Sequence, residues 1–387
     1  MSGVDTAALD RVRAAFEKNF AEGLEVGAAV SIWQDGEEIL NLHAGHRDGA
    51  RTQPWEADTL VLIWSATKGL AAACVLHALE QRGMPLDVRV AEFWPEFGQC
   101  GKQSLTVGQV LSHRAGLSAL DEQNLSLLDH DGVARAIERQ VPLWEDGGHG
   151  YGPRSFGFVA DEMVRRLTGG TTLGDYFRQH FAEPLDLELW IGLPPELHGR
   201  VAQMLAARMT GCSEPEDAFM EAMATPDSLT RRAFNSPGGL PGASAMNSPA
   251  ARAASIPSLG GIGSASSLGR FYAMLAAGGS WNGRQFFDPH TLHWMSEPLA
   301  NGFDRVLRIE TAFSAGFMLD PVGPDGAKLR HYFGPSLRSF GHPGAGGSLG
   351  FADPDSRIGF AYVMNQMELG VLRHRRALRL VEALYGL

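Results

Sequence analysis

Two side chains that can carry out acyl transfer stand three residues apart near the start of the chain. Ser65 and Lys68 lie within residues 64–69. A serine hydroxyl is a weak nucleophile until a neighbouring base takes its proton, and an unprotonated lysine amine can be that base. Residues three apart in a helix have Cβ atoms about 5–6 Å apart on one face. The spacing therefore favours a serine nucleophile activated by Lys68.

The segment after Ser65 predicts the environment that such a lysine needs. Residues 70–76 are apolar on every side of a predicted helix, so this helix must be buried. Lowering the pKa of lysine by roughly 3 units from its reference value near ~10.4 costs about 4 kcal/mol. Burial and the positive end of the helix dipole can supply that. The alternative is that Ser65 only caps the helix and that Lys68 points to solvent or pairs with a carboxylate.

Five segments along the chain form a specific set by their order and spacing. They are residues 65–68, 105–117, 151–169, 260–264 leading into 268–271, and 340–347. With this set the sequence resembles the class C β-lactamase-like serine hydrolases over nearly its whole length, and within them the family VIII carboxylesterases. The resemblance implies an α+β fold of the β-lactamase and penicillin-binding-protein (transpeptidase-like) type, in which helices flank an antiparallel sheet and a helical domain is inserted.

Tyr151 is identified by this resemblance as the tyrosine that helps to move the serine proton and later activates water. The pattern of residues 156–158 and 162–169 fixes the alignment. Residues 152–154 depart from the family pattern, because Gly-Pro-Arg stands where these esterases usually have His-Ala. Pro153 also stands where β-lactamases have the asparagine of Tyr-x-Asn. The alternative for Tyr151 is a packed or surface tyrosine.

The third motif of β-lactamases, Lys-Thr-Gly on an edge strand that lines the cleft, is matched by residues 342–344. The resemblance implies an oxyanion hole formed by the backbone N–H groups of Ser65 and Ala345. Loss of one such donor typically costs about 3–4 kcal/mol. The alternative for His342 is a hydrogen-bonded structural histidine, in which case the peptide N–H groups matter more than the ring. The expected substrate-binding residues are Trp64, His342 and Gly344.

Ser348 is a rival nucleophile, because residues 346–350 match the Gly-x-Ser-x-Gly elbow of α/β-hydrolases. Such an elbow needs a strand before it, a helix after it, and an acid and then a histidine later in the chain. Ser348 instead leads into strand-like residues, and only His374 follows. We expect His113 to pack or cap locally. The basic run 373–376 is expected on the solvated face of the last helix.

Both ends of the chain are predicted to contribute to one sheet. Strands are expected at residues 26–33 and 38–44, joined by a tight turn at Asp35-Gly36, and again at residues 348–352 and 357–364. Amphipathic helices are expected at residues 5–20 and 372–384. The predicted sheet domain comprises residues 1–75 and 264–387.

Helical patterns dominate the part of the chain between these ends. Residues 76–263 are expected to form a largely helical inserted domain, with the active site in the cleft between the two parts. Residues 234–267 are rich in small residues and proline and are expected to form a long ordered loop. The expected helices cover residues 70–82, 107–113, 132–139, 158–167 and 173–181.

Composition excludes several classes of partner. The chain has 33 Lys and Arg against 44 Asp and Glu, a net charge of −11, which would repel nucleic acid. No signal peptide and no apolar stretch of membrane-spanning length is apparent. Three cysteines, at positions 74, 100 and 212, give neither a disulfide framework nor a zinc spacing. We therefore expect a cytoplasmic protein without metal or other cofactor, and a homo-oligomer is possible.

The sequence as a whole predicts a serine carboxylesterase that hydrolyses short-chain acyl esters through a covalent acyl-Ser65 intermediate. One alternative is β-lactamase or D-amino-acid peptidase or amidase activity with the same Ser-Lys-Tyr machinery. The absence of the Tyr-x-Asn asparagine and of the Lys-Thr-Gly lysine disfavours it. The other alternative is a catalytically silent binding protein of the same fold. The presence of Ser65, Lys68 and Tyr151 together argues against that.

Overall fold

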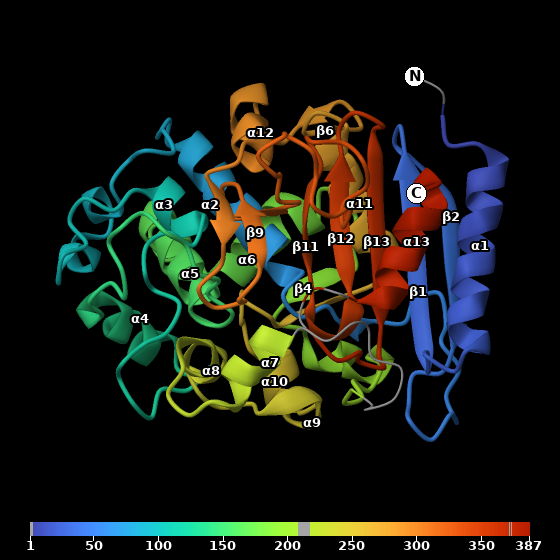
Figure 1. The fold of residues 1–387 in the computed structure, drawn as a ribbon, viewed down its shortest axis with the longest axis horizontal. Helices are drawn as coiled ribbons and strands as arrows, with labels where there is room; N and C mark the ends of the chain where they lie inside the picture. Colours follow the sequence, from blue (N-terminus) through green and yellow to red (C-terminus); the bar gives the residue numbers. More distant parts are fainter. Residues whose placement is uncertain (1–2, 208–216, 371, 373) are drawn as a thin grey trace.

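An eight-stranded antiparallel sheet organises the computed structural model, which describes residues 3–207, 217–370, 372 and 374–387 (Figure 1). The strand order is β2-β1-β13-β12-β11-β10-β9-β8, so β1 and β13, from the two ends of the chain, pair within one sheet. The bounds are β1 Gly27–Gln34, β2 Glu37–Gly45, β8 Ala300–Phe303, β9 Glu310–Phe313, β10 Met318–Leu319, β11 Phe340–Pro343, β12 Leu349–Asp353 and β13 Ile358–Met364.

The predicted hairpin between β1 and β2 is confirmed. Asp35 and Gly36 have φ values of 52° and 88°, the left-handed pair that a two-residue hairpin turn of matching twist requires. Ala28 pairs with Ala44 on β2 and with Met364 on β13. The hairpin therefore carries the N-terminal strands directly onto the C-terminal ones, and this antiparallel sheet with flanking helices is the predicted fold class.

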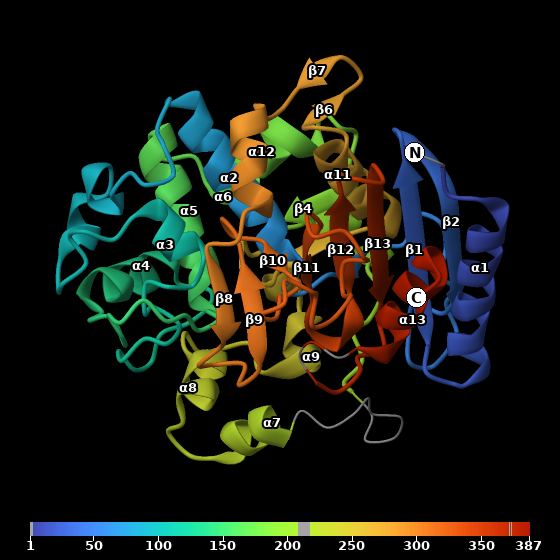
Figure 2. The same cartoon turned by 45° about the horizontal axis from the view of Figure 1, so that its top comes forward.

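Both faces of the sheet are covered by helices, as Figures 1 and 2 show. On β1, Val30 and Ile32 pack in one core with helices α1 (Thr6–Ala21) and α13 (Arg375–Tyr385). The alternate residue Ala29 belongs to a second core, which includes helix α11 (Ala265–Ala276). Side chains alternate between the faces of a strand, so β1, which is buried on both sides, is mostly apolar.

The remaining helices lie beside the sheet, and α2 is their centre. Every residue from Thr67 to Leu79 of α2 is buried, which confirms the buried helix expected after Ser65. The helix begins at Thr67, so Ser65 lies in the preceding turn. The bounds are α2 Thr67–Gln81, α3 Val107–Leu111, α4 His130–Arg139, α5 Ser155–Thr168, α6 Leu173–Phe177, α7 Asp217–Ala224, α8 Leu229–Asn235, α9 Gly242–Met246, α10 Pro249–Ala253 and α12 Pro289–Ser296.

Two expectations about this region are wrong in detail. Residues 234–267 do not form one long loop, because they contain α9, α10 and a strand, β5 (Gly261–Gly263). Small residues and proline favour turns, yet α9 begins after Pro241 and α10 begins at Pro249. Proline fits the first turn of a helix, as Pro249 does in α10. The helix predicted at 173–181 ends at Phe177 and continues as a π-helical turn.

Strand β5 ties the centre of the chain to the segment before Ser65. It pairs with β3 (Val61–Leu62) on one side and β4 (Leu189–Ile191) on the other, as a three-stranded antiparallel sheet. A separate hairpin joins β6 (Ser280–Trp281) to β7 (Arg284–Gln285). The division into domains at residues 75 and 263 stays a prediction.

Two of the three cysteines lie in the described part of the chain. Cys74 is buried and Cys100 exposed, both as free thiols, and Cys212 lies outside the described residues. None of the helices in the described part of the chain is long and apolar enough to cross a bilayer.

A buried charge cluster between α4 and α5 makes stability depend on pH. His130 lies 3.0 Å from Asp161 and 3.1 Å from Glu162. Burial alone lowers the pKa of His130, but these two carboxylates raise it to about 9. A folded-state pKa above the unfolded value of ~6.5 gives stability that is complete below pH ~6.5 and is lost as the pH rises through about 9.

We therefore expect the free energy of unfolding to fall by about 1–3 kcal/mol between pH 6.5 and 9.5, after allowance for solvent screening at the partly exposed ring. Urea denaturation at both pH values measures this difference. In His130→Gln the difference should shrink by that amount. An equal difference in both proteins would contradict the assignment to His130.

Candidate active site

Ser65 lies in the sharp turn that joins β3 to α2. The N–H of Ile63 donates to the carbonyl of Gly261 (2.9 Å), and Trp64 then adopts a left-handed φ of 51°. This conformation costs a non-glycine residue on the order of 1–2 kcal/mol, and the Thr67 hydroxyl, which donates to the carbonyl of Trp64, holds it in place. The Ser65 side chain is half-buried, so it stays open to a substrate.

Lys68 lies next to this serine with no exposed surface. Its Nζ is 3.2 Å from Ser65 Oγ and also donates to the carbonyls of Pro153 (2.9 Å) and Ser258 (2.8 Å). Burial lowers the pKa of Lys68 well below its usual range. A neutral amine has two N–H groups and one lone pair. Because the two carbonyls accept the two N–H groups, the lone pair is left for the hydroxyl of Ser65, whose O–H then donates.

A second buried lysine shows how this arrangement differs from a structural one. Lys102 is also fully buried, and its Nζ donates to three backbone carbonyls at 2.9, 3.0 and 2.6 Å. Three acceptors satisfy all three N–H groups of an ammonium. Lys68 has only two carbonyl acceptors and, in the third position, a hydroxyl that can itself donate. The surroundings of Lys68 thus accommodate an unprotonated amine.

Tyr151, in the segment before α5, lies beside Lys68. The Nζ of Lys68 lies 4.8 Å from the centroid of the Tyr151 ring. Burial raises the pKa of Tyr151 well above its usual range, and the neighbouring Ser65 side chain only partly opposes this. The phenol is therefore neutral at pH 7 and can donate or relay a proton.

His113 packs against Tyr151 and does not touch Ser65 in any recorded contact. The two ring centroids are 5.0 Å apart, edge to face, and Nδ1 of His113 accepts the N–H of Gly152 at 3.2 Å. Burial is the main cause that lowers the pKa of His113 well below its usual range. The expectation that His113 packs locally is confirmed, and its neutral ring holds the backbone that follows Tyr151.

Asp304 holds the backbone of Tyr151 through its carboxylate. No sequence motif identifies this residue. Both carboxylate oxygens accept the N–H of Tyr151 at 3.1 Å, and further bonds come from the N–H groups of Val306 and Leu307, each 2.8 Å. Burial raises the pKa of Asp304 to about 6 against the lowering effect of these N–H donors. Its position between β8 and β9 gives no periodic signal, so only the folded chain shows its role.

The segment expected to hold the third motif lies directly against the Ser65 turn. A Cβ placed on Gly344 would lie 2.3 Å from the carbonyl oxygen of Ile63 and 3.2 Å from Cβ of Trp64, so any side chain there would collide. Strand β11 is interior to the sheet, and the edge strand expected from the resemblance is not observed. The last residues of β11, His342 and Pro343, nevertheless pair only with β12, because β10 pairs with β11 at Gly341 alone.

The N–H groups of Ser65 and Ala345, predicted as the oxyanion hole, meet no acceptor among the described residues. By contrast, the neighbouring N–H groups of Gly344 and Gly347 are engaged with Ser348 and Gly344 carbonyls at 2.6 and 3.1 Å. Buried N–H groups are nearly always paired in folded proteins. Two free donors on adjacent segments beside a serine hydroxyl could bind an anionic oxygen.

His342 is buried beside this group, with its ring centroid 5.9 Å from that of Tyr151. Burial is the main cause that lowers the pKa of His342 to about 3, so the ring is neutral at pH 7. Nδ1 lies 2.7 Å from the carbonyl of Pro343 and therefore carries the hydrogen and donates. Nε2 is then an acceptor without a partner among the described residues.

The rival nucleophile Ser348 serves a structural contact. Its side chain is buried and its hydroxyl donates to the carbonyl of Ile63 at 2.8 Å, so it links β12 to the Ser65 turn. It precedes a strand, β12, and not the helix that an elbow needs. Trp64, expected to bind substrate, is only partly buried, and its indole N–H meets no acceptor in the described part of the chain.

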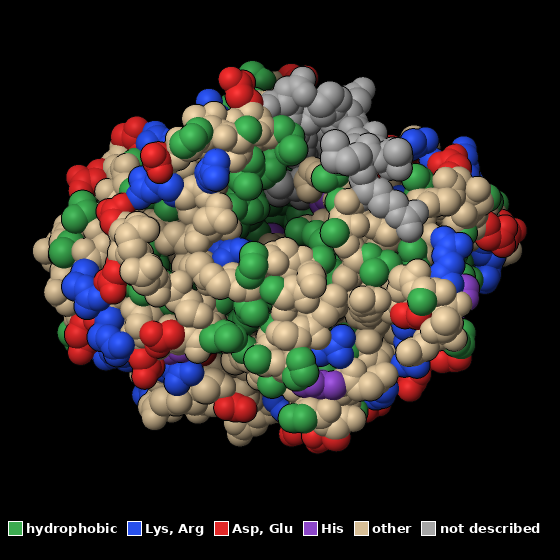
Figure 3. Space-filling view, turned by 90° about the horizontal axis from the view of Figure 1, so that it is seen from below, with side chains coloured by type: hydrophobic (Ala, Val, Ile, Leu, Met, Phe, Trp, Pro, Cys, Tyr) green, Lys and Arg blue, Asp and Glu red, His purple; other side chains and the backbone are tan. Residues whose placement is uncertain are grey.

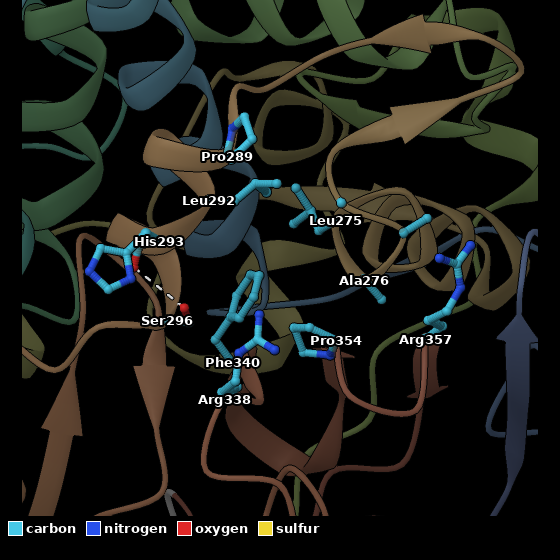
Figure 4. Close-up of a pocket in the computed structure, with 12 residues that line it drawn as sticks. Leu275, Ala276, Pro289, Leu292, His293, Ser296, Arg338, Phe340, Pro354 and Arg357 are labelled. Atoms are coloured by element: carbon cyan, nitrogen blue, oxygen red, sulfur yellow. Dashed lines mark hydrogen bonds between the residues drawn. The ribbon is translucent and has the colours of Figure 1, made fainter. Parts of the chain in front are cut away.

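A separate pocket of about 440 Å³ contains none of these residues (Figure 4). Leu275, Leu292 and Phe340 point into it, and Arg338 and Arg357 stand near its edge. Phe340 is the first residue of β11, whereas the free N–H groups follow the last one. Both arginines are paired with aspartates, Asp355 and Asp35 respectively. This pocket therefore lies at the opposite end of the strand from Ser65.

A hollow marks the face of the molecule on the side of α7 to α10. Figure 3 shows hydrophobic side chains gathered around this hollow near the centre of the face. Among the described residues, no group of three or more His, Cys, Asp or Glu side chains is placed to hold a metal ion.

Known proteins are similar in sequence to this chain over most of its length. The family model described as beta-lactamase matches residues 16–385. "Esterase/beta-lactamase LipL" of Mycobacterium tuberculosis (strain ATCC 25618 / H37Rv) is 32% identical over 346 residues, which cover 88% of this chain and 77% of that protein.

Solved structures show the same likeness in three dimensions. A penicillin-binding-protein homolog from Caulobacter crescentus is 35% identical with a TM-score of 0.86, and the match covers 100% of this chain and 99% of that one. A family VIII carboxylesterase is 34% identical with a TM-score of 0.87 and the same coverage of both chains. By sequence and by fold, the chain belongs to the beta-lactamase family of serine hydrolases.

Proposed function

We propose that the protein is a serine carboxylesterase, with Ser65 as nucleophile, Lys68 as its base and Tyr151 as a proton relay. The observation that carries this proposal is the surroundings of the Lys68 amine. Two carbonyls take its two N–H groups and leave the lone pair for the Ser65 hydroxyl at 3.2 Å. A general base must lie within hydrogen-bonding reach of the proton that it takes and must be unprotonated. The 3.2 Å distance supports the first condition, and burial, which lowers the pKa of Lys68, supports the second.

The first half of the reaction forms an acyl-enzyme. Ser65 Oγ attacks the ester carbonyl carbon while its proton passes to Lys68 Nζ. The carbonyl oxygen becomes an oxyanion, which the N–H groups of Ser65 and Ala345 stabilise more strongly than they stabilise the substrate's carbonyl. The proton then passes from Lys68 to the departing alkoxide, through the neutral phenol of Tyr151. The C–O bond breaks, and the alcohol leaves.

The second half returns the enzyme to its starting state. Water takes the place of the alcohol and gives its proton to the Tyr151–Lys68 pair as its oxygen attacks the acyl carbon. The same two N–H groups stabilise the second oxyanion. Its collapse breaks the bond to Ser65 Oγ, which regains a proton from Lys68. Two products that leave in sequence should give ping-pong kinetics.

Esters are favoured over β-lactams and peptides because of the residue at position 342. The carboxylate of a β-lactam or a peptide would find a neutral imidazole there, since the pKa of His342 is lowered to about 3. A hydrogen bond to a charged group is worth about 1.5–3 kcal/mol, so its loss lowers kcat/KM by about 10- to 100-fold. The structure of a family VIII carboxylesterase, 34% identical, supports the ester reading. The name of the relative LipL, an esterase/beta-lactamase, keeps β-lactam hydrolysis as the second candidate.

A substrate panel tests this proposal. We expect kcat/KM for nitrophenyl butyrate to exceed that for nitrocefin and for a peptide that ends in a D-amino acid with a free carboxylate by at least about 10-fold, from the charge argument above. Preference for nitrocefin would replace esterase by β-lactamase activity. No turnover of any substrate, and no labelling by a fluorophosphonate, would favour a silent binding protein.

The position of Tyr151 yields a prediction about Asp304. In Asp304→Asn an NH₂ replaces one carboxylate oxygen, so the N–H of Tyr151 keeps only one of its two acceptors and loses the negative charge that it faces, and Tyr151 should shift. A displacement near 1 Å can lower catalysis up to about 100-fold, and we expect a loss of kcat for nitrophenyl butyrate of about 10-fold or more. The control Asp146→Asn changes an exposed partner of Arg305 and should stay near wild type. Wild-type kcat in Asp304→Asn would contradict the role given to Asp304.

A further inference from the structure

Helix α13 contributes a buried arginine, Arg376, and the solvent exposure expected for it from the sequence is wrong. Residues 373–376 were expected on the solvated face of this helix, but Arg376 is 2% exposed and His374 is fully buried. Only Arg375 of the described members is exposed, and Arg373 lies outside the described residues. An arginine without water must find acceptors for five N–H groups within the protein.

All five N–H groups of Arg376 have partners. Nε donates to Glu368 (3.2 Å), and Nη1 donates to Glu25 (2.5 Å) and to the carbonyl of Leu24 (3.1 Å). Nη2 donates to two further carbonyls, those of Gly346 (2.9 Å) and Gln366 (2.7 Å). The two carboxylates compensate the charge, and the fixed fork of the guanidinium joins backbone segments from both ends of the chain.

One of these carbonyls belongs to the turn that carries the Ala345 N–H. Gly346 has a left-handed φ of 81°, and a Cβ there would lie 2.6 Å from Cγ of Met367. Its carbonyl accepts from Arg376 and from the N–H of Glu368 (3.0 Å), while the N–H at the other end of the same peptide, on Gly347, donates to Gly344. This peptide is held at both ends, so the turn cannot rotate without breaking these bonds.

Rotation of this turn would move the Ala345 N–H, because only one residue separates that group from the held peptide. An oxyanion donor is effective when it lies 2.7–3.1 Å from the oxygen that develops charge. We propose that Arg376 is a positioning residue for the oxyanion hole, holding the 345–347 turn so that the Ala345 N–H faces the Ser65 hydroxyl. This inference rests on the proposed function of Ser65 and Ala345.

The test compares two arginines of the same helix. Arg376→Lys keeps one charge beside Glu25 and Glu368 but lacks the planar fork, so it cannot reproduce five bonds. We expect kcat for nitrophenyl butyrate to fall about 10- to 100-fold, below the 10²- to 10³-fold loss typical when a donor is removed outright, with KM changed less than about 3-fold. The control Arg379→Lys alters an ion pair with Glu22 and a hydrogen bond to the side-chain oxygen of Asn19, both outside the site, and should leave kcat near wild type.

A second readout separates positioning from a general structural role. A trifluoromethyl ketone forms a tetrahedral adduct with the serine, so its affinity should fall in Arg376→Lys by the same factor as kcat/KM. Unchanged kcat and unchanged affinity for this ketone would overturn the inference. If Ser65→Ala were inactive in the same experiment, the proposed function would still stand. If Ser65→Ala were fully active, the proposed function itself would fail.

A second variant keeps the inference testable if Arg376→Lys does not fold. Glu368→Ala removes the partner of Nε, yet the backbone N–H of residue 368 remains. Arg376 would be less firmly held, and kcat should fall about 3- to 10-fold, the equivalent of one weakened hydrogen bond, with KM unchanged. Wild-type kcat in a folded Glu368→Ala protein would then overturn the inference.

Discussion

Replacement of Ser65 by alanine should lower kcat for nitrophenyl butyrate by about 10⁴- to 10⁶-fold, because no other group can form the acyl-enzyme. The oxyanion donors and the binding pocket stay in place, so a small rate above that of water should remain. Initial rates measured by nitrophenolate release, with the thermal unfolding temperature as a check on folding, give the result.

Ser348→Ala is the matched control for this variant. The Ser348 hydroxyl makes one buried hydrogen bond, to the carbonyl of Ile63, and its loss costs about 1 kcal/mol. We expect kcat within about 5-fold of wild type, from that energy. If Ser348→Ala were inactive and Ser65→Ala active, Ser348, in a nucleophile elbow formed by residues 346–350, would replace Ser65 as the nucleophile.

Lys68→Met should lower kcat by about 10³- to 10⁴-fold, since methionine is similar in length but cannot take the proton of Ser65. The carbonyls of Pro153 and Ser258 lose their donor, so the free energy of unfolding should also fall, by about 1–3 kcal/mol. Stopped-flow measurement of the first turnover would show a slower acylation step. The pH dependence of kcat/KM offers a second readout, because the acid limb should reflect protonation of Lys68.

The second buried lysine separates loss of the base from loss of stability. Lys102→Met strips three carbonyls of a donor and should destabilise the protein at least as much, while kcat stays near wild type at a temperature where both variants are folded. Equal losses of kcat in the two variants would show that Lys68 acts through stability alone.

The parts of the fold that follow from local rules could be predicted from the sequence. The Asp35-Gly36 pair predicts a hairpin because few other residues adopt its left-handed conformation. The apolar run after Ser65 predicts a buried helix because no face is left for water. The three-residue spacing of Ser65 and Lys68 then brings their side chains together without any long-range contact.

The parts that depend on distant partners could not be predicted. Asp304 is an isolated carboxylate in a loop, and only the folded chain shows that it holds the backbone of Tyr151. Arg376 stands in a basic run, which usually indicates a solvated face. Its partners Glu25 and Glu368 lie in other segments, and their charges allow it to be buried. Residues 234–267 form short helices because packing outweighed their weak local preference.

Peptide mapping after reaction with a fluorophosphonate identifies the nucleophilic serine. The probe bonds to a serine only where a base has activated the hydroxyl and donors stabilise the phosphoryl oxygen. We expect a single adduct, on the peptide that contains Ser65, formed far more slowly in Lys68→Met. An adduct on Ser348, or an enzyme that hydrolyses esters while Ser65 stays unlabelled, would contradict this expectation.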